Sequence, residues 1–122
     1  MLDESIFTRN DAREAIRQNA CDLISIYPGK NGGILRSMQI ACLAETAGLQ
    51  CIIGSNLELD MGTAAMLHLA IAMPALATSV DHDIIGPLYY DRHYTKSPIR
   101  FENGCALLPE GPGLGLVPEL SA

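Results

Sequence analysis

The sequence predicts an α/β fold in which parallel strands alternate with helices. Three short runs are rich in branched apolar residues and bounded by Gly or Pro, as buried strands are; they span residues 22–27, 49–53 and 79–85. Their centres, near Ile24, Ile52 and Val80, lie 28 residues apart. A repeated strand–helix unit of this length is typical of parallel strands joined by right-handed crossovers.

Helical patterns fill the gaps between these runs. Residues 33–47 place apolar and polar side chains in a rhythm of about 3.6 residues, and Gly48 supplies a stop signal. Residues 62–73 are apolar nearly all round, which predicts a well-buried helix that ends at Pro74. Both predicted helices therefore connect one strand to the next.

The start of the chain supplies part of an earlier unit. Residues 10–19 predict an amphipathic helix with Thr8 or Asn10 as its N-cap. Counting back about one repeat from Tyr27 places residues 1–4 at the carboxyl end of a preceding strand. A closed βα barrel needs eight strands and about 250 residues. We therefore expect the last units of a barrel that has been divided by a gene split or shortened.

The composition changes after Pro87. Pro and Gly become frequent, and Asn103-Gly104 stands between two β-like runs, which is a strong hairpin signal. We expect residues 1–87 to form the barrel units. Residues 88–122 are expected to form a tail of loops and a hairpin that packs back on the barrel and on a capping region.

The charge and the cysteines exclude several classes of protein. A net charge of −6 without a basic stripe argues against nucleic-acid binding. No signal peptide and no membrane-spanning segment is expected, which predicts a cytoplasmic protein. No two cysteines form a CxxC pair, and each lies in an apolar run, which favours reduced, buried thiols over disulfides or a zinc site. The cysteines are Cys21, Cys42, Cys51 and Cys105.

Carboxylates gather where the predicted strands end, which is where ligands bind in parallel βα folds. Close carboxylates repel one another unless a cation is present, and hard oxygen ligands suit Mg²⁺. For Asp60 we favour the alternative of capping the helix that follows it. The residues concerned are Asp3, Glu4, Glu58, Asp60, Asp81 and Asp83.

Seven motifs follow one another in an order that resembles one enzyme family, the mandelate racemase and muconate-lactonising group of the enolase superfamily. The resemblance covers almost the whole chain. It implies an α+β capping domain on a modified TIM (βα) barrel, of which this chain is a part. It also implies removal of the proton α to a carboxylate, with the resulting enediolate held by Mg²⁺. The motifs are Asp3-Glu-Ser5, Gly29-Lys-Asn-Gly-Gly-Ile34, Ala44-Glu-Thr-Ala-Gly48, Gly54-Ser-Asn-Leu-Glu58, the Ala-rich helix with His68, Asp83-Ile-Ile-Gly-Pro87 and Gly111-Pro-Gly-Leu-Gly115.

The resemblance assigns roles to four residues at the predicted strand ends. Asp3 matches the third carboxylate ligand of the metal, and Glu4 matches an acid that pairs with a catalytic lysine. Tyr27 stands where the family has an acid/base lysine, whereas Lys30 matches a lysine of structural role. Tyrosine is a poor base, with an ordinary pKa near about 10, but it can donate a hydrogen bond or act as an acid. The other metal ligands and a base pair would lie outside this chain.

The expected substrate-binding residues are Asp81 and Asp83, together with Glu58. Alternate residues of a strand face one side, so both aspartates should point into one pocket while His82 points away and is structural. The pair resembles the Asp-x-Asp element by which dipeptide epimerases hold a substrate ammonium, which suggests an amino or imino acid. His68 is expected to be a hydrogen-bonded core residue, and His93, in a tyrosine-rich loop, could reach a substrate.

The main functional expectation is the C-terminal part of a Mg²⁺-dependent enzyme that is inactive alone. Loss of one base favours dehydration, as in the hydroxyproline dehydratases of the superfamily. The alternatives are a racemase, epimerase or muconate-type cycloisomerase, and a non-catalytic truncated domain. The expected partners are a small carboxylate substrate and the missing N-terminal half or another copy of the chain in a homo-oligomer, with neither nucleic acid nor membrane.

Overall fold

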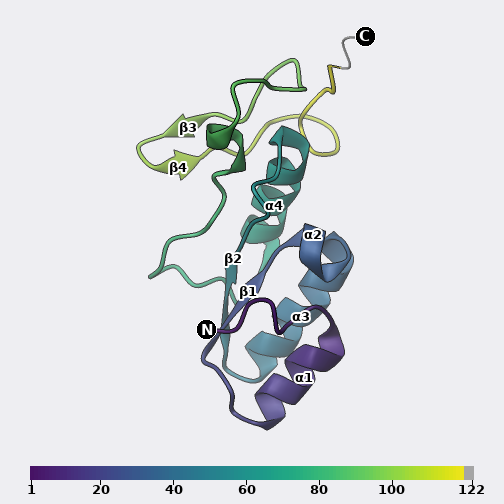
Figure 1. The fold of residues 1–122 in the computed structure, drawn as a ribbon, viewed down its shortest axis with the longest axis vertical. Helices are drawn as coiled ribbons and strands as arrows, with labels where there is room; N and C mark the ends of the chain where they lie inside the picture. Colours follow the sequence, from purple (N-terminus) through teal and green to yellow (C-terminus); the bar gives the residue numbers. More distant parts are fainter. Residues whose placement is uncertain (120–122) are drawn as a thin grey trace.

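The computed structural model describes residues 1–119 and contains the predicted parallel strand pair (Figure 1). Strand β1 (Leu23–Ile26) pairs with β2 (Gln50–Ile53), with Leu23 opposite Gln50 and Ile26 opposite Ile53. Three of the four residues in each strand are buried. Ile24, Ile26, Cys51 and Ile53 share one face of the sheet and join the hydrophobic core, whereas Ser25 and Ile52 are buried on the opposite face.

Two further segments extend this sheet as isolated bridges. Leu2 lies parallel to β1, where its N–H donates to the Leu23 carbonyl and its carbonyl accepts from Ser25, both at 2.9 Å. Leu76 bridges Cys51 on the other side of β2. The start of the chain thus occupies the place predicted for the end of a preceding strand.

The strand predicted over residues 79–85 is absent, which corrects the sequence analysis. Pairing with β2 falls on residues 75–77, where Cys51 N–H donates to the Ala75 carbonyl at 2.7 Å. Ala75 and Ala77 are small and buried, whereas residues 78–81 are exposed and leave the sheet. The chain returns at Ile53, whose N–H donates to His82 Nδ1 at 3.1 Å and whose carbonyl accepts from Asp83 N–H at 2.8 Å.

The three predicted helices are present close to their expected bounds. They are α1 (Arg9–Arg17), α3 (Ile34–Thr46) and α4 (Asp60–Ala72). Thr8 is the N-cap of α1, where its hydroxyl accepts from Asp11 N–H and the Asp11 carboxylate accepts from Thr8 N–H. Gly48 ends the α3 segment with a φ of 74°, which glycine adopts at little cost.

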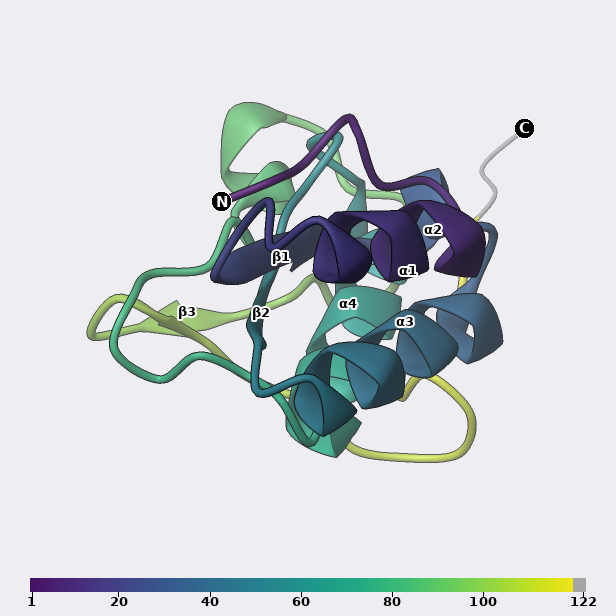
Figure 2. The same ribbon diagram turned by 90° about the horizontal axis from the view of Figure 1, so that it is seen from below.

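A short helix, α2 (Pro28–Asn31), was not predicted. Pro28 fits its first turn, and Gly32, with a φ of 79°, ends it. Helices α1 and α3 lie side by side at one end of the molecule, and the strands run between them and the C-terminal tail (Figures 1 and 2). Helix α2 begins two residues after β1 ends and so lies at the carboxyl end of that strand.

The tail contains the predicted hairpin. Strand β3 (Phe101–Glu102) pairs antiparallel with β4 (Cys105–Ala106), and Asn103 and Gly104 both have positive φ, as a type I′ turn requires. A 3₁₀ turn, η1 (Gly86–Tyr89), precedes it. Residues 120–122 of the predicted tail lie outside the described part of the chain.

Asp60 lies in the first turn of α4, where a carboxylate was expected, but its side chain does not cap the helix. Leu59 is the N-cap of α4, and no side chain caps that helix. The Asp60 carboxylate is 2% exposed, accepts from Ile99 N–H at 2.8 Å and lies 2.9 Å from His93 Nδ1. Asp60 and His93 therefore fasten the tail to α4, because a buried carboxylate needs hydrogen-bonding partners.

The four cysteines are free, but the prediction that all are buried is wrong. Only Cys51 is buried, whereas Cys42 and Cys105 are exposed. Burial raises the pKa of the Cys51 thiol to about 12, with a smaller contribution from Cys21. His68 is half-buried, and its Nε2 has no hydrogen-bond partner within residues 1–119, contrary to expectation. None of the helices described is long and apolar enough to cross a membrane.

Candidate active site

Tyr27 lies at the carboxyl end of β1 and is held there by Asn31. Its backbone N–H donates to Asn31 Oδ1 at 3.0 Å. Asn31 is 2% exposed, and its Nδ2 donates to the Ile6 and Phe7 carbonyls at 2.9 and 3.1 Å. The buried amide of Asn31 thus joins α2 to residues 6–7. It also fixes the backbone of Tyr27.

Tyr27 is 5% exposed, and its ring lies against Gly54 at the end of the neighbouring strand. A Cβ on Gly54 would lie 2.8 Å from Tyr27 Cδ1 and 2.3 Å from Ser25 Oγ, far inside normal contact distance. The motif Gly54-Ser-Asn-Leu-Glu58 was noted in the sequence, but this function of its glycine was not. The absence of a side chain at Gly54 therefore leaves the space that the Tyr27 ring occupies.

The surroundings of Tyr27 keep its phenol protonated. Burial raises the pKa of Tyr27, and the charges of Asp3, Glu4 and Glu58 raise it further. An uncharged phenol is favoured because water is excluded and negative charges are close. Tyr27 is therefore suited to donate a hydrogen bond or a proton, and it is not suited to remove one from carbon.

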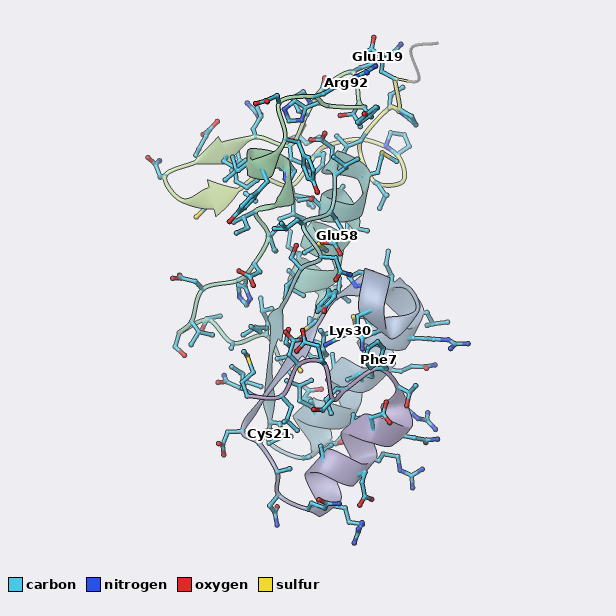
Figure 3. All side chains as sticks on the ribbon, in the orientation of Figure 1. Phe7, Cys21, Lys30, Glu58, Arg92 and Glu119 are labelled. Atoms are coloured by element: carbon cyan, nitrogen blue, oxygen red, sulfur yellow. The ribbon has the colours of Figure 1, made fainter. Side chains whose placement is uncertain are left out.

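Asp3 faces a buried ammonium. Lys30 Nζ lies 2.5 Å from Asp3 Oδ1 and is also bonded to the carbonyl of Asp3 at 2.8 Å. Figure 3 shows the Lys30 side chain directed toward the strands. The sequence placed both residues at strand ends, but nothing in the local pattern predicted that they form a pair.

Glu58 is held by a tight loop at the end of β2. Its Oε2 accepts from Ser55 Oγ at 2.8 Å and from Asn56 N–H at 2.9 Å. Leu57 has a φ of 58°, which is unusual for a residue with a bulky side chain, and Tyr90 Oη donates to its carbonyl at 2.9 Å. A Cβ on Gly86 would lie 2.1 Å from the Glu58 carbonyl oxygen. Ser55 and Asn56 thus hold one carboxylate oxygen of Glu58, and the contacts of Tyr90 and Gly86 hold the backbone of its loop.

Asp81 and Asp83 are both exposed, and they are placed differently from the predicted pair. Because residues 78–81 leave the sheet, alternation does not set their directions. Asp81 and His82 line the same hollow, about 700 Å³ in volume, and Asp83 is not among its lining residues. The assignment of Asp81, Asp83 and Glu58 to substrate binding stays a prediction. So do the catalytic roles of Glu4 and Tyr27 and the metal-ligand role of Asp3.

The residues described do not form a complete metal site. No group of three His, Cys, Asp or Glu side chains in residues 1–119 is placed to hold an ion. Asp3 has the right chemistry for one hard oxygen ligand. A divalent ion at Asp3 would therefore need donors from outside this chain.

Comparison with known proteins identifies the family of this chain. The family described as enolase C-terminal domain-like matches residues 1–122. The chain belongs to this family. The predicted resemblance and the α/β fold class are confirmed.

The relatives of this enolase-superfamily chain are isomerases. It is 38% identical over 116 residues to muconate cycloisomerase 1 of Rhodococcus opacus, covering 95% of this chain and 31% of that protein. It is 37% identical to an L-Ala-D/L-Glu epimerase of Clostridium acetobutylicum, covering 95% of this chain and 32% of the epimerase.

Solved structures give the same relationship. The R. opacus 1CP 2-chloromuconate cycloisomerase superposes with a TM-score of 0.90 at 31% identity, covering 96% of this chain and 31% of that one. A substrate-liganded L-Ala-D/L-Glu epimerase from Bacillus subtilis gives 0.87 at 30% identity, with 98% and 32% covered. The chain thus spans about a third of the length of these relatives. They support the isomerase alternative better than the dehydratase that the sequence analysis put first.

Proposed function

We propose that this chain forms part of the active site of an enolase-superfamily isomerase that acts on a carboxylate substrate with a single base. The observation that carries the proposal is a buried tyrosine, Tyr27, where the family resemblance expects the second acid/base lysine; burial and nearby carboxylates raise its pKa. A racemase or epimerase needs a base on each face of the α carbon. A reaction that moves one proton on one face does not.

Cycloisomerisation meets this requirement. One carboxylate of a conjugated dicarboxylate adds to a carbon–carbon double bond, and the displaced electron pair moves into the second carboxylate. The resulting enediolate takes one proton at its α carbon, either from the protonated form of the single base or from the Tyr27 phenol, which closes the balance. A divalent ion, when bound, would supply positive charge next to the enediolate oxygens.

The residues of this chain take three parts in the proposal. Asp3 offers one oxygen ligand, and Glu4 lies beside it to accept a hydrogen bond from a catalytic group outside the chain. Tyr27 donates a hydrogen bond to the substrate or delivers a proton, because its phenol stays uncharged near pH 7. The remaining ligands and the base come from the N-terminal part of a complete enzyme or from another copy of the chain.

Deuterium incorporation tests this function. The chain, combined with the segment that completes its barrel, is incubated in D₂O with muconate and, separately, with L-Ala-L-Glu, and both reactions are followed by NMR. We expect a lactone carrying one deuterium at its α carbon and no exchange in the dipeptide. Rapid α-deuteration with inversion of the dipeptide would show two-base chemistry and contradict the proposal.

Dehydration of a β-hydroxy amino or imino acid is the second candidate. It also needs only one base, and the exposed carboxylates of Asp81 and Asp83 favour a cationic substrate. In the same experiment with a β-hydroxy amino acid, loss of water would identify this reaction.

A further inference from the structure

The Lys30 side chain is almost fully buried and uses all of its donors. It is 2% exposed, and its Nζ donates to Asp3 Oδ1, the Asp3 carbonyl and the Ser25 carbonyl at 2.5, 2.8 and 2.9 Å. An ammonium has three N–H donors, so none remains. The ammonium also lies 4.5 Å from the centre of the Tyr27 ring. Lys30 therefore has no free donor with which to hold a substrate.

The groups that surround Lys30 belong to two adjacent parallel segments at the point where their pairing stops. Leu2 and Ile24 form the bridge between these segments. Just beyond it, Lys30 reaches from α2 and binds both the carbonyl of Asp3 and the carbonyl of Ser25. The Lys30 side chain therefore links the start of the chain to β1 at a point where no backbone hydrogen bond between described residues joins them.

These contacts orient the Asp3 carboxylate. Oδ1 is bound to Lys30, whereas Oδ2 has no hydrogen bond to any residue that the structure describes. The Asp3 side chain is 32% exposed, so its Oδ2 is accessible to a ligand. A carboxylate held at one oxygen and at its own backbone has little freedom to rotate.

We propose that Lys30 is a positioning residue that holds Asp3 so that a single carboxylate oxygen is offered to a divalent ion. The inference rests on the proposed function, which makes Asp3 a metal ligand. Groups that hydrogen-bond to a ligating carboxylate orient it, and their loss weakens metal binding by about 10–100-fold.

A purely electrostatic role predicts the opposite sign. An ammonium repels a divalent cation. If Lys30 only neutralised Asp3, its removal would leave a free carboxylate and would tighten metal binding. The direction of the change in affinity therefore separates positioning from charge compensation.

Mn²⁺ is the probe for the test, because its paramagnetism broadens NMR signals near it even when binding is weak. The ¹⁵N-labelled 122-residue chain is titrated as the parent, Lys30→Met, Lys30→Gln and Lys96→Met. Lys96 is the only other lysine and is exposed, so the control removes the same charge elsewhere. For the parent we expect broadening centred on Asp3 and Glu4 with millimolar affinity, as few ligands are in place.

The proposal expects Lys30→Met to weaken this binding about tenfold or more, and Lys96→Met to leave it unchanged. Lys30→Gln keeps hydrogen-bond donors without the charge, so it should bind Mn²⁺ more tightly than Lys30→Met. Binding in Lys30→Met that is unchanged or tighter than in the parent would overturn the proposal.

A second measurement on the same samples needs no metal. The Ser25 amide donates to the Leu2 carbonyl, so its hydrogen exchange reports whether the start of the chain stays on β1. We expect faster exchange in Lys30→Met and not in Lys96→Met, and unchanged exchange would contradict positioning. If the parent shows no broadening at Asp3, the metal role in the proposed function fails, while the exchange experiment still decides the role of Lys30.

Discussion

Two groups of carboxylates lie near the ends of the sheet strands; the protein holds the first group in place and leaves the second exposed. At the end of β1, Asp3 is bound by a buried ammonium, and the Tyr27 ring lies against Gly54. Beyond β2, Asp81 and Asp83 are exposed, and neither carboxylate makes a hydrogen bond within the described residues. The first region has the fixed geometry that acid–base chemistry and metal ligation require. The second has carboxylates that can adjust to a ligand.

The largest effect should come from removing the amide that fixes the first region. Asn31→Ala leaves Tyr27 N–H and the Ile6 and Phe7 carbonyls without their partner. We expect the free energy of unfolding to fall by about 3 kcal/mol, since buried polar groups would be left unsatisfied. Chemical denaturation measures it, with Asn10→Ala on the exposed face of α1 as the matched control. A loss no larger than that of the control would show that the first region is not held by Asn31.

The contrast between these regions also marks what the sequence could predict. Strands β1 and β2 and helices α1, α3 and α4 were predicted close to their observed bounds, because apolar periodicity and Gly or Pro punctuation determine them locally. The pairing of residues 75–77 was missed because it depends on which side chains of residues 75–85 can be buried against β2. The β-branched residues Val80, Ile84 and Ile85, later in that segment, gave the stronger local strand signal.

The sequence could propose candidate site residues, but it could not predict the contacts that these residues make. Asp3, Tyr27 and Glu58 were identified from their positions at strand ends and from the motifs around them. The Lys30–Asp3 pair spans 27 positions of the chain, and no local pattern encodes it. The same holds for Gly54, whose missing side chain matters only because Tyr27 lies across from it.

A smaller effect is expected when Gly54 is given a side chain. Gly54→Ala places a methyl group against Tyr27 Cδ1 and Ser25 Oγ, and overpacking of this kind costs about 1–3 kcal/mol. Ser25→Ala removes the closer contact, so a double-mutant cycle by denaturation separates the two clashes. If the cost persists in Gly54→Ala with Ser25→Ala, the Tyr27 ring is its cause. A cost that vanishes in the double variant would mean that the ring moves freely.

The alkaline stability of the chain tests the protonated state of Tyr27. Its pKa is raised in the folded state, so this group stabilises the fold fully below the ordinary tyrosine pKa and loses that contribution as the pH rises through the folded pKa. The pKa of Cys51 is likewise raised in the folded state, to about 12, so ionisation of this thiol also destabilises the fold at high pH. We expect the midpoint of urea unfolding to fall above about pH 9, where the thiol of Cys51 ionises in the unfolded chain, and more steeply above about pH 10, where tyrosine ionises there. The fall should be shallower in Tyr27→Phe, and an unchanged slope in that variant would show that Tyr27 is ionised equally in both states.

The smallest effect on stability, and the clearest separation of the two regions, is expected at the second one. Asp81→Asn with Asp83→Asn should change the free energy of unfolding by less than about 0.5 kcal/mol, because both side chains are exposed and make no hydrogen bonds. In a complete enzyme the same change should weaken binding of an amino-acid substrate, through the lost charge contact, and leave binding of a dicarboxylate unaffected or tighter. Calorimetric titration with both ligand classes measures this. Because Asp83 N–H still donates to the Ile53 carbonyl, the backbone keeps its place in the variant. Weaker binding of the dicarboxylate would show that these carboxylates position the segment, and that the two strand ends differ less in rigidity than their contacts indicate.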